Sequence, residues 1–257
     1  KDMPELKVRL KTSDGSQENV RRLATGGADF TIAAADAVET YELGHHPGAD
    51  RLRGVARLYD DYVQLVVPRD SDIRSVADLR GKRVAIGPTR SGVRLIADRV
   101  LTAAGIDPDK DITPSSYGIA DGPERLKAGK LDAFFWSGGL PTEGLAKLAD
   151  SFTFRFVPIS AKLVAKLHAQ GGATRYYRST NMPESAYPSI QNGLALPAIA
   201  GSNLLMSRAG CSPRLTDCVT LTGITSRDAR VAAVRSAHLC DQRSTLTHDT
   251  RPLQEAA

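Results

Sequence analysis

The chain has 257 residues, of which 41% are hydrophobic and 25% charged, a composition typical of folded globular proteins rather than disordered or collagen-like chains. No uninterrupted apolar run reaches the ~18 residues that a membrane-spanning helix needs. The net charge of +5 comes from 34 basic residues scattered among 29 acidic ones, and aromatic residues make up only 5%, so no nucleic-acid partner is expected.

The first quarter of the chain alternates between strand and helix patterns. Residues 6–10 alternate apolar and polar side chains and predict a strand. A polar turn follows, and Ser16 is expected to cap a helix that the glycines at 26–27 end. Residues 30–33 predict the next strand, and residues 52–67 contain a long extended run.

The middle of the chain continues the same alternation. Residues 75–83 predict a short helical turn that ends at a glycine, and residues 84–86 predict a strand. Residues 93–104 carry apolar side chains at helical spacing and predict a helix with Ser91 as its N-cap. Alternating strands and helices of this length predict an α/β fold with largely parallel sheets.

The last fifty residues differ from the rest. They are rich in Ser, Thr and Arg, and only residues 231–239 show a modest helical pattern. The three cysteines, Cys211, Cys218 and Cys240, all lie here, and their spacing fits no zinc motif. Two interpretations stay open, a disulfide between the first two and three ordinary thiols.

Two segments of the chain resemble each other. Residues 22–30 and 125–134 both read Arg-Leu, two residues, Gly, two residues, Asp and an apolar strand. Either this is how any helix-to-strand junction looks, or the chain has two lobes built on one unit. With residues 62–68 and 192–200 as the crossing segments, residues 1–67 plus 192–257 form lobe 1 and residues 68–191 form lobe 2.

The strongest candidate for a ligand site is the turn at residues 87–92, which connects a predicted strand to a predicted helix. The first amides of a helix have no acceptor within the helix, so such a turn attracts carboxylate or phosphate groups. The sequence is neither a P-loop nor a dinucleotide-binding fingerprint. The alternative is a capped helix with solvent-facing arginines. The candidate ligand-binding residues are Gly87, Thr89, Arg90, Ser91 and Gly92.

A second strand-to-helix turn supplies Gly15, Ser16 and Asn19 as candidates. Ligands bind open α/β sheets at the carboxyl ends of the strands, so the two turns, one from each lobe, are expected to face each other across a cleft. The alternative for this turn alone is a simple helix cap.

A third candidate is the aromatic strand that breaks into Gly138 and Gly139. Trp136 is expected to form one wall of the pocket, with Ser137 and the Gly138 amide beside it. Core aromatic residues followed by a turn are the alternative.

Residues suited to catalysis are sparse. His45 and His46 lie in a loop and have no partner at metal-ligand spacing. Asp60 and Asp61 are neighbours in an extended run, so their side chains point to opposite faces and do not form a dyad. No nucleophile elbow is present. No catalytic residue, metal or cofactor is therefore expected.

The sequence as a whole resembles the TAXI family of solute receptors, the binding subunits of tripartite ATP-independent (TRAP-type) transporters. The matching segments fall in family order. They are residues 12–19, 28–30, 76–87, 91–92 with the helix that follows, 126–135, 139–141, 156–159 and Tyr187. The strand and Gly-rich loop with which the family opens have no counterpart, so a fold trimmed at its N-terminus is expected.

The resemblance implies a two-lobed periplasmic-binding-protein-like α/β fold of type II and no enzymatic activity. It implies a monomer that captures a small organic anion, such as glutamate or a dicarboxylate, by lobe closure and delivers it to membrane permease subunits. It also implies an extracytoplasmic location, periplasmic or anchored at the cell surface, with the signal segment not present in this chain.

Two other functions stay open at this stage. An enzyme on a periplasmic-binding-like fold would need His45, His46 or Asp61 beside Ser91. A ligand-binding sensory domain would be encoded next to a kinase or regulator rather than next to a permease.

Overall fold

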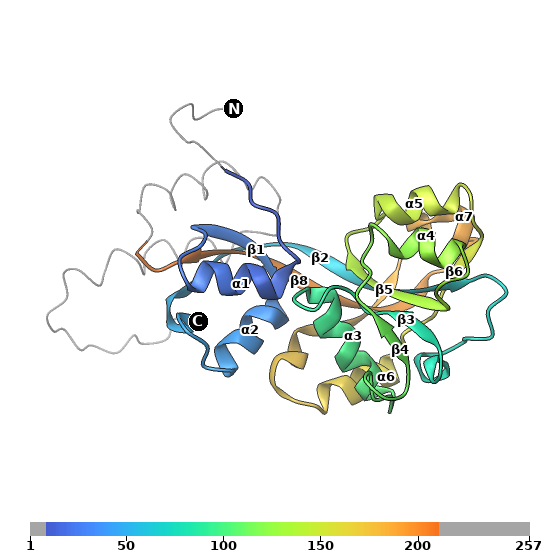
Figure 1. Cartoon of the computed structure of the whole chain (residues 1–257), viewed down its shortest axis with the longest axis horizontal. Coiled ribbons are helices and arrows are strands. Elements are labelled where there is room, and N and C mark those ends of the chain that lie inside the picture. Colours follow the sequence, from blue (N-terminus) through green and yellow to red (C-terminus); the bar gives the residue numbers. More distant parts are fainter. Residues whose placement is uncertain (1–8, 211–257) are drawn as a thin grey trace, which may run out of the picture.

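The computed structural model describes residues 9–210 (Figure 1). The strands in this range are β1 (Phe30–Ala34), β2 (Leu52–Pro68), β3 (Arg83–Ala85), β4 (Thr113–Ser115), β5 (Ala133–Gly138), β6 (Phe154–Phe156), β7 (Tyr177–Met182) and β8 (Leu196–Arg208). The α-helices are α1 (Ser16–Ala24), α2 (Ala35–Leu43), α3 (Gly92–Ala103), α4 (Gly122–Lys127), α5 (Glu143–Ala149), α6 (Ala161–His168) and α7 (Pro188–Gln191). Short 3₁₀ helices cover Ala49–Arg51, Val76–Leu79, Gly172–Tyr176 and Glu184–Ala186.

Most of the elements expected from the sequence are present, most with ends that move by a residue or so, and the helical turn expected at 75–83 is a 3₁₀ helix over Val76–Leu79. The expected strand at 6–10 is not confirmed, because residues 6–8 lie outside the described range and Arg9 and Leu10 are not in a strand. The expected helix at 231–239 and all three cysteines also lie outside that range.

The strands form one sheet in the order β1-β8-β2-β5-β3-β4, with β6 pairing with β2 and β7 pairing with β8. The long strands β2 and β8 pair along most of their length, from Leu52 opposite Arg208 to Val63 opposite Ile199. Figure 1 shows them running along the molecule from the end that carries α1 and α2 toward the end that carries α4, α5 and α7. The proposed crossing segments belong to these two strands and the turn before β8, and the division into two lobes stays a prediction.

The expectation of a largely parallel sheet is wrong. Within residues 9–210, only the β3–β4 and β3–β5 pairings are parallel, and the other five are antiparallel. The parallel strands belong to one continuous unit in which α3 and α4 connect β3, β4 and β5. Strand β2 carries the chain into that unit and runs opposite to β5, so the longest strands contribute antiparallel pairs.

Apolar side chains cover both faces of the sheet. One buried cluster joins β2, β3 and β5 to the inner face of α3, where Val100 and Leu101 are fully buried. A second cluster joins the other face to α5 and α7, and a third joins α1, α2 and β1. None of the helices described between residues 9 and 210 is long and apolar enough to cross a membrane.

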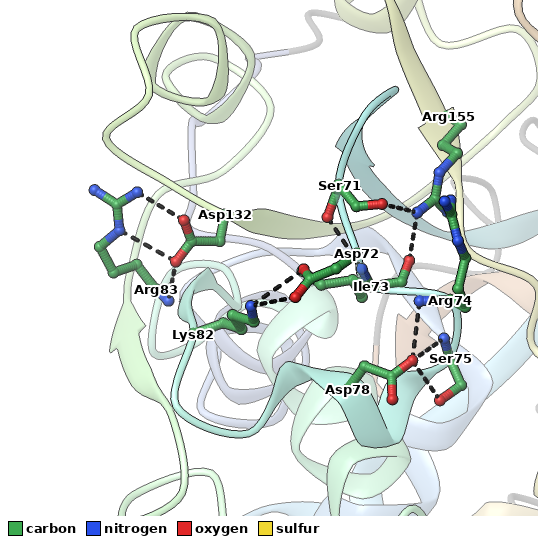
Figure 2. A network of polar contacts seen from close by, with 10 residues as sticks. All are labelled: Ser71, Asp72, Ile73, Arg74, Ser75, Asp78, Lys82, Arg83, Asp132 and Arg155. Carbon is green, nitrogen blue, oxygen red and sulfur yellow. Dashed lines mark hydrogen bonds and ion pairs between the residues drawn. The ribbon is translucent and has the colours of Figure 1, made fainter.

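The two similar segments of the sequence are both helix-to-strand junctions. α1 leads to β1 through Gly26, and α4 leads to β5 through Gly129, and both glycines have the expected positive φ. The strand after the first junction is not parallel to its neighbour, as the expected largely parallel sheet would require, because β1 pairs with β8 antiparallel. At the second junction, Asp132 accepts hydrogen bonds from the backbone and guanidinium of Arg83, which ties the start of β5 to β3 (Figure 2).

Candidate functional site

A cavity of about 460 Å³ lies where several turns of the fold meet. Its lining comes from residues 13–16 at the start of α1, residues 91–93 at the start of α3, and residues 116 and 118–121 between β4 and α4. Pro88, Asp36 of α2, Ile96 of α3, residues 136–137 of β5 and single residues of β1, β2, β7 and β8 complete the described lining. The volume is within the range of ligand pockets for small metabolites.

The cavity brings together residues from all three turns that the sequence singled out. Six of the candidate residues line it: Gly15, Ser16, Ser91, Gly92, Trp136 and Ser137. They come from positions more than a hundred residues apart, and the carboxyl ends of β3, β4 and β5 bring the later turns to one edge of the sheet. Their role in binding stays a proposal.

Ser91 is the N-cap of α3, as expected. Its Oγ accepts a hydrogen bond from the Arg94 N–H at 3.0 Å and donates one to the Pro88 carbonyl at 2.7 Å. The side chain is buried at 4% exposure. The amides of Gly92 and Val93 lie in the first turn of α3, where the helix itself offers no acceptor, so they are available to a ligand group.

The start of α1 differs from the expectation that Ser16 caps it. Gly15 is the N-cap, and Ser16 is the first helical residue. The Ser16 hydroxyl accepts a hydrogen bond from the Ala34 N–H at 3.1 Å instead. The serine therefore joins the start of α1 to the end of β1.

The turns before α1 and α3 contact each other directly, rather than facing each other across open space. Gln17 donates a side-chain hydrogen bond to the Ser91 carbonyl at 2.7 Å, and the Glu18 N–H donates to the Arg90 carbonyl at 3.2 Å. A Cβ on Gly15 would lie only 3.2 Å from the Ser91 Cα. The two turns thus close one side of the cavity.

Three candidate polar residues do not reach the cavity. Asn19 lies one turn along α1, and its side chain donates to the Ile32 carbonyl at 3.0 Å. Arg90 is exposed and pairs with Asp14 at 3.2 Å, and Thr89 is also exposed. Residues 89 and 90 lie in the turn between β3 and α3, and their side chains are exposed to solvent rather than part of the cavity lining.

Two candidate glycines are buried and shape the site without lining it. Gly87 has φ +86°, and a Cβ there would lie 2.9 Å from the Val93 Cβ. A Cβ on Gly138 would lie 2.5 Å from Nε1 of Trp136, whose indole N–H donates to Thr142 at 3.0 Å. Both glycines therefore leave room for side chains of the cavity wall.

A buried polar cluster that no sequence pattern predicted lies beside the cavity. Asp36, at the start of α2, accepts hydrogen bonds from the Tyr177 hydroxyl at 2.5 Å and from Arg99 at 3.0 Å. Arg99 also donates to Thr40 at 2.7 Å. Asp36 and Tyr177 line the cavity, and Asp36 lies two residues after the end of β1, close to a strand end where ligands commonly bind.

Burial dominates the ionisation of this cluster. It raises the pKa of Asp36 above its ordinary value, although the hydrogen bond from Tyr177 and the charge of Arg99 act in the opposite direction. Burial, together with the negative charge of Asp36, holds the pKa of Tyr177 well above 10.0, so its hydroxyl stays protonated.

Asp60 and Asp61 point to opposite sides of β2, as the extended pattern predicts. Asp60 pairs with Arg57 and Arg178, and although burial acts to raise its pKa, these hydrogen bonds lower it. Asp61 lines the cavity. From its sequence pattern, Asp61 was weighed as half of a dyad and as an acid–base residue beside Ser91, but not as a ligand-binding residue.

The arrangement offers little support for catalysis. Asp61 and Ser91 do line the same cavity, which is one placement that an enzyme would need. The only hydroxyl proton of Ser91, however, is donated to the Pro88 carbonyl. His45 and His46 are absent from the lining, and residues 9–210 contain no group of three His, Cys, Asp or Glu side chains that could hold a metal ion.

The sequence profile of the NMT1-like family matches residues 2–223 of the chain. Three solved structures extend this comparison. The alkanesulfonate-binding protein SsuA from Xanthomonas axonopodis pv. citri, bound to MOPS, has a TM-score of 0.52 and 20% identity over 92% of this chain and 70% of that one. The periplasmic aliphatic sulphonate binding protein SsuA from Escherichia coli has a TM-score of 0.42 and 22% identity over 56% of this chain. The substrate binding protein of an amino acid ABC transporter has a TM-score of 0.49 and 16% identity over 83% of this chain and 71% of that one.

The likeness to the Xanthomonas protein shows that the chain has the mixed α/β fold of type II periplasmic binding proteins. The match covers 44% of the length of the Escherichia coli protein.

Proposed function

The chain belongs to the NMT1-like family, and from this premise we propose that it is the solute-binding component of a transporter. The observation that carries the proposal is the cavity of about 460 Å³ lined by the first turns of α1 and α3. Helix N-termini attract carboxylate and other anionic groups, and the hydroxyls of Ser16 and Ser137 add hydrogen-bonding partners at the same cavity.

The proposed solute is a small organic acid, such as glutamate or a dicarboxylate, held as the two ends of the molecule close around it. The proposed partner is the permease of a TRAP-type transporter. This finer assignment is supported by the order of the TAXI-like segments along the sequence, among them residues 12–19 and 91–92, which form parts of the cavity lining. On this proposal the protein acts as a monomer outside the cytoplasm, with residues 1–67 plus 192–257 and residues 68–191 as its two lobes.

Titration calorimetry and thermal-shift measurements on the full chain would test the proposal. The ligand panel contains L-glutamate, L-glutamine, glutarate and succinate, with an alkanesulfonate for comparison with the protein from Xanthomonas. We expect at least one carboxylate to bind with a dissociation constant in the micromolar range, about −8 kcal/mol. Absence of heat and of any melting-temperature shift, in protein with native circular dichroism, would contradict it. A permease gene beside the coding gene would support transport, and a kinase or regulator gene would indicate sensing.

Replacing Ser91 with alanine tests the α3 turn. We expect a loss of about 1 kcal/mol in unfolding free energy, because the cap of α3 is removed. Solute affinity should fall about tenfold, because the turn that presents the first-turn amides loses its hydrogen bond to Pro88.

Ser160→Ala is the matched control for Ser91→Ala. Ser160 is the N-cap of α6 and accepts a hydrogen bond from the Leu163 N–H, but it does not line the cavity. This variant should lose comparable stability and keep full affinity. Unchanged affinity in Ser91→Ala, or an equal loss of affinity in both variants, would place the binding site elsewhere.

A further inference from the structure

The cavity is lined by carboxylates and by no basic side chain among its described residues. Asp14, Asp36, Asp61 and Asp121 belong to the lining, and no Lys, Arg or His does. This charge pattern is unfavourable for a solute whose groups are all negative, because like charges repel strongly where water is partly excluded.

Two of these carboxylates already have cationic partners. Asp14 pairs with Arg90 at 3.2 Å, outside the cavity lining. Asp36 pairs with Arg99 at 3.0 Å and also accepts from the Tyr177 hydroxyl. Asp121 is exposed to solvent, where its charge is well hydrated. The charge that remains to be matched within the cavity is therefore that of Asp61.

Asp61 lies on β2 opposite Gly201 of β8, and its side chain is partly buried. Among residues 9–210 it forms no ion pair with a Lys, Arg or His side chain, and the nearby amide of Asn203, which acts to lower the pKa of Asp61, forms no hydrogen bond of normal geometry. Burial raises the pKa of Asp61, and the carboxylates of Asp36 and Asp60 raise it further. A partly buried carboxylate without a cation carries an energetic cost that a cationic ligand group would offset.

Two aromatic side chains also belong to the cavity wall. Trp136 is fixed by its hydrogen bond to Thr142, and the Tyr177 hydroxyl is held by Asp36 and Arg99. Aromatic rings attract cations through their negative faces. The Arg99 guanidinium already lies 5.7 Å from the Tyr177 ring centroid, so Trp136 is the aromatic residue of the wall that remains for a positively charged ligand group.

Elsewhere in the same lining, the Gly92 amide and the Ser16 and Ser137 hydroxyls suit a negative group. We infer that the solute is zwitterionic: its protonated amine pairs with Asp61, and its carboxylate binds at the first turn of α3. This inference rests on the proposed function and narrows it, because it selects amino-acid-like solutes over dicarboxylates.

The test compares solutes that differ only by the amine. Glutamate and glutarate form one pair, and alanine with propionate and leucine with 4-methylpentanoate form two others. Calorimetry on the full chain should show that the tightest-binding amino acid binds about ten- to a hundredfold more strongly than its amine-free partner, as expected for a charge-assisted hydrogen bond. Asp61→Asn should remove this preference while leaving the amine-free acid bound equally or more tightly.

Asp60→Asn is the matched control. It removes the same charge one residue away on the opposite side of β2, so the preference for the amino acid should persist. Circular dichroism and thermal melting would establish that both variants are folded, and Asp61→Asn is expected to melt no lower than the parent.

The outcomes separate the two proposals. Equal or tighter binding of the amine-free acid by the parent protein, or an unchanged preference in Asp61→Asn, would overturn the zwitterion inference and leave solute binding intact. No binding of any solute by folded protein would overturn the proposed function itself.

Discussion

Replacing Arg99 with methionine is expected to lower the free energy of unfolding by about 3–5 kcal/mol, the usual cost of leaving a buried charge without its partner. Arg99 reaches from α3 to Asp36 and Thr40 on α2 and to Tyr177 on β7. The side chains of Arg99 and Asp36 are only 17% and 7% exposed, so water replaces little of the lost interaction. Urea denaturation followed by circular dichroism measures the change.

The deficit of Arg99→Met should depend on pH. Burial already raises the pKa of Asp36, and removing Arg99 removes one of the interactions that lower it. Because the folded form then holds its proton at a higher pH than the unfolded form, the stability of the variant rises as the pH falls through that interval. The difference from the parent should therefore be largest at neutral pH and shrink under mildly acidic conditions.

Two further variants keep this test specific. Asp36→Asn in the Arg99→Met background removes the unpaired charge and should recover much of the loss. Arg83→Met breaks the exposed pair with Asp132 (Figure 2) and should cost far less, because exposed pairs contribute little. Equal losses in Arg83→Met and Arg99→Met would show that burial of the Asp36 cluster is not what stabilises it.

Gly15→Ala is expected to cost about 2–3 kcal/mol of stability and to weaken solute binding more than tenfold. Gly15 has φ +130° and ψ −156°, a region that is nearly exclusive to glycine. Its added Cβ would also lie 3.2 Å from the Ser91 Cα, so the turns before α1 and α3 would have to separate at the cavity. Denaturation and calorimetry on the same samples measure both effects.

Gly105→Ala is the control that separates two causes of the stability loss in Gly15→Ala, the strained backbone and the contact of the added Cβ with Ser91. Gly105 has φ +80°, and a Cβ there would meet nothing within 4 Å. This variant should lose about 1 kcal/mol, the ordinary cost of a side chain in the left-handed region, and retain its affinity. If Gly15→Ala retained full affinity as well, the contact between the two turns would have no role in binding.

The sequence predicts the local elements of this fold well because their signals are local. The apolar spacing and the Ser91 cap identify α3, and the glycines after α1 and α4 identify the two junctions. The direction of strand pairing was predicted wrongly, because it depends on how β2 and β8 traverse the sheet. No single residue of β2 or β8 indicates which strands will be its neighbours or in which direction they run.

In the candidate site, too, residues with a local sequence signal were predicted and residues placed by the assembled sheet were not. Gly15 and Ser91 were recognised because each lies in a turn before a helix, where ligands commonly bind, and Trp136 because it precedes the Gly138–Gly139 break. Asp61 lies within β2 and Tyr177 is the first residue of β7, at its amino end, and only the assembled sheet brings them to the cavity. Arg90 shows the opposite case, since a charged residue in the right turn points away from the cavity and pairs with Asp14.

The paired strands β2 and β8 also determine how the molecule deforms. Their pairing is interrupted in β2 between Gly54 and Ala56 and again between Arg57 and Tyr59, and such bulges increase local twist. At these bulges β1 pairs with the other edge of β8, so three strands lie side by side there, and β2 and β8 lack a third strand only where Asp60 lies opposite Ser202. Any rotation of the α1–α2 end relative to the α4–α5 end is therefore expected to twist β2 and β8 most at Asp60 and Ser202, where the pair has no further strand beside it.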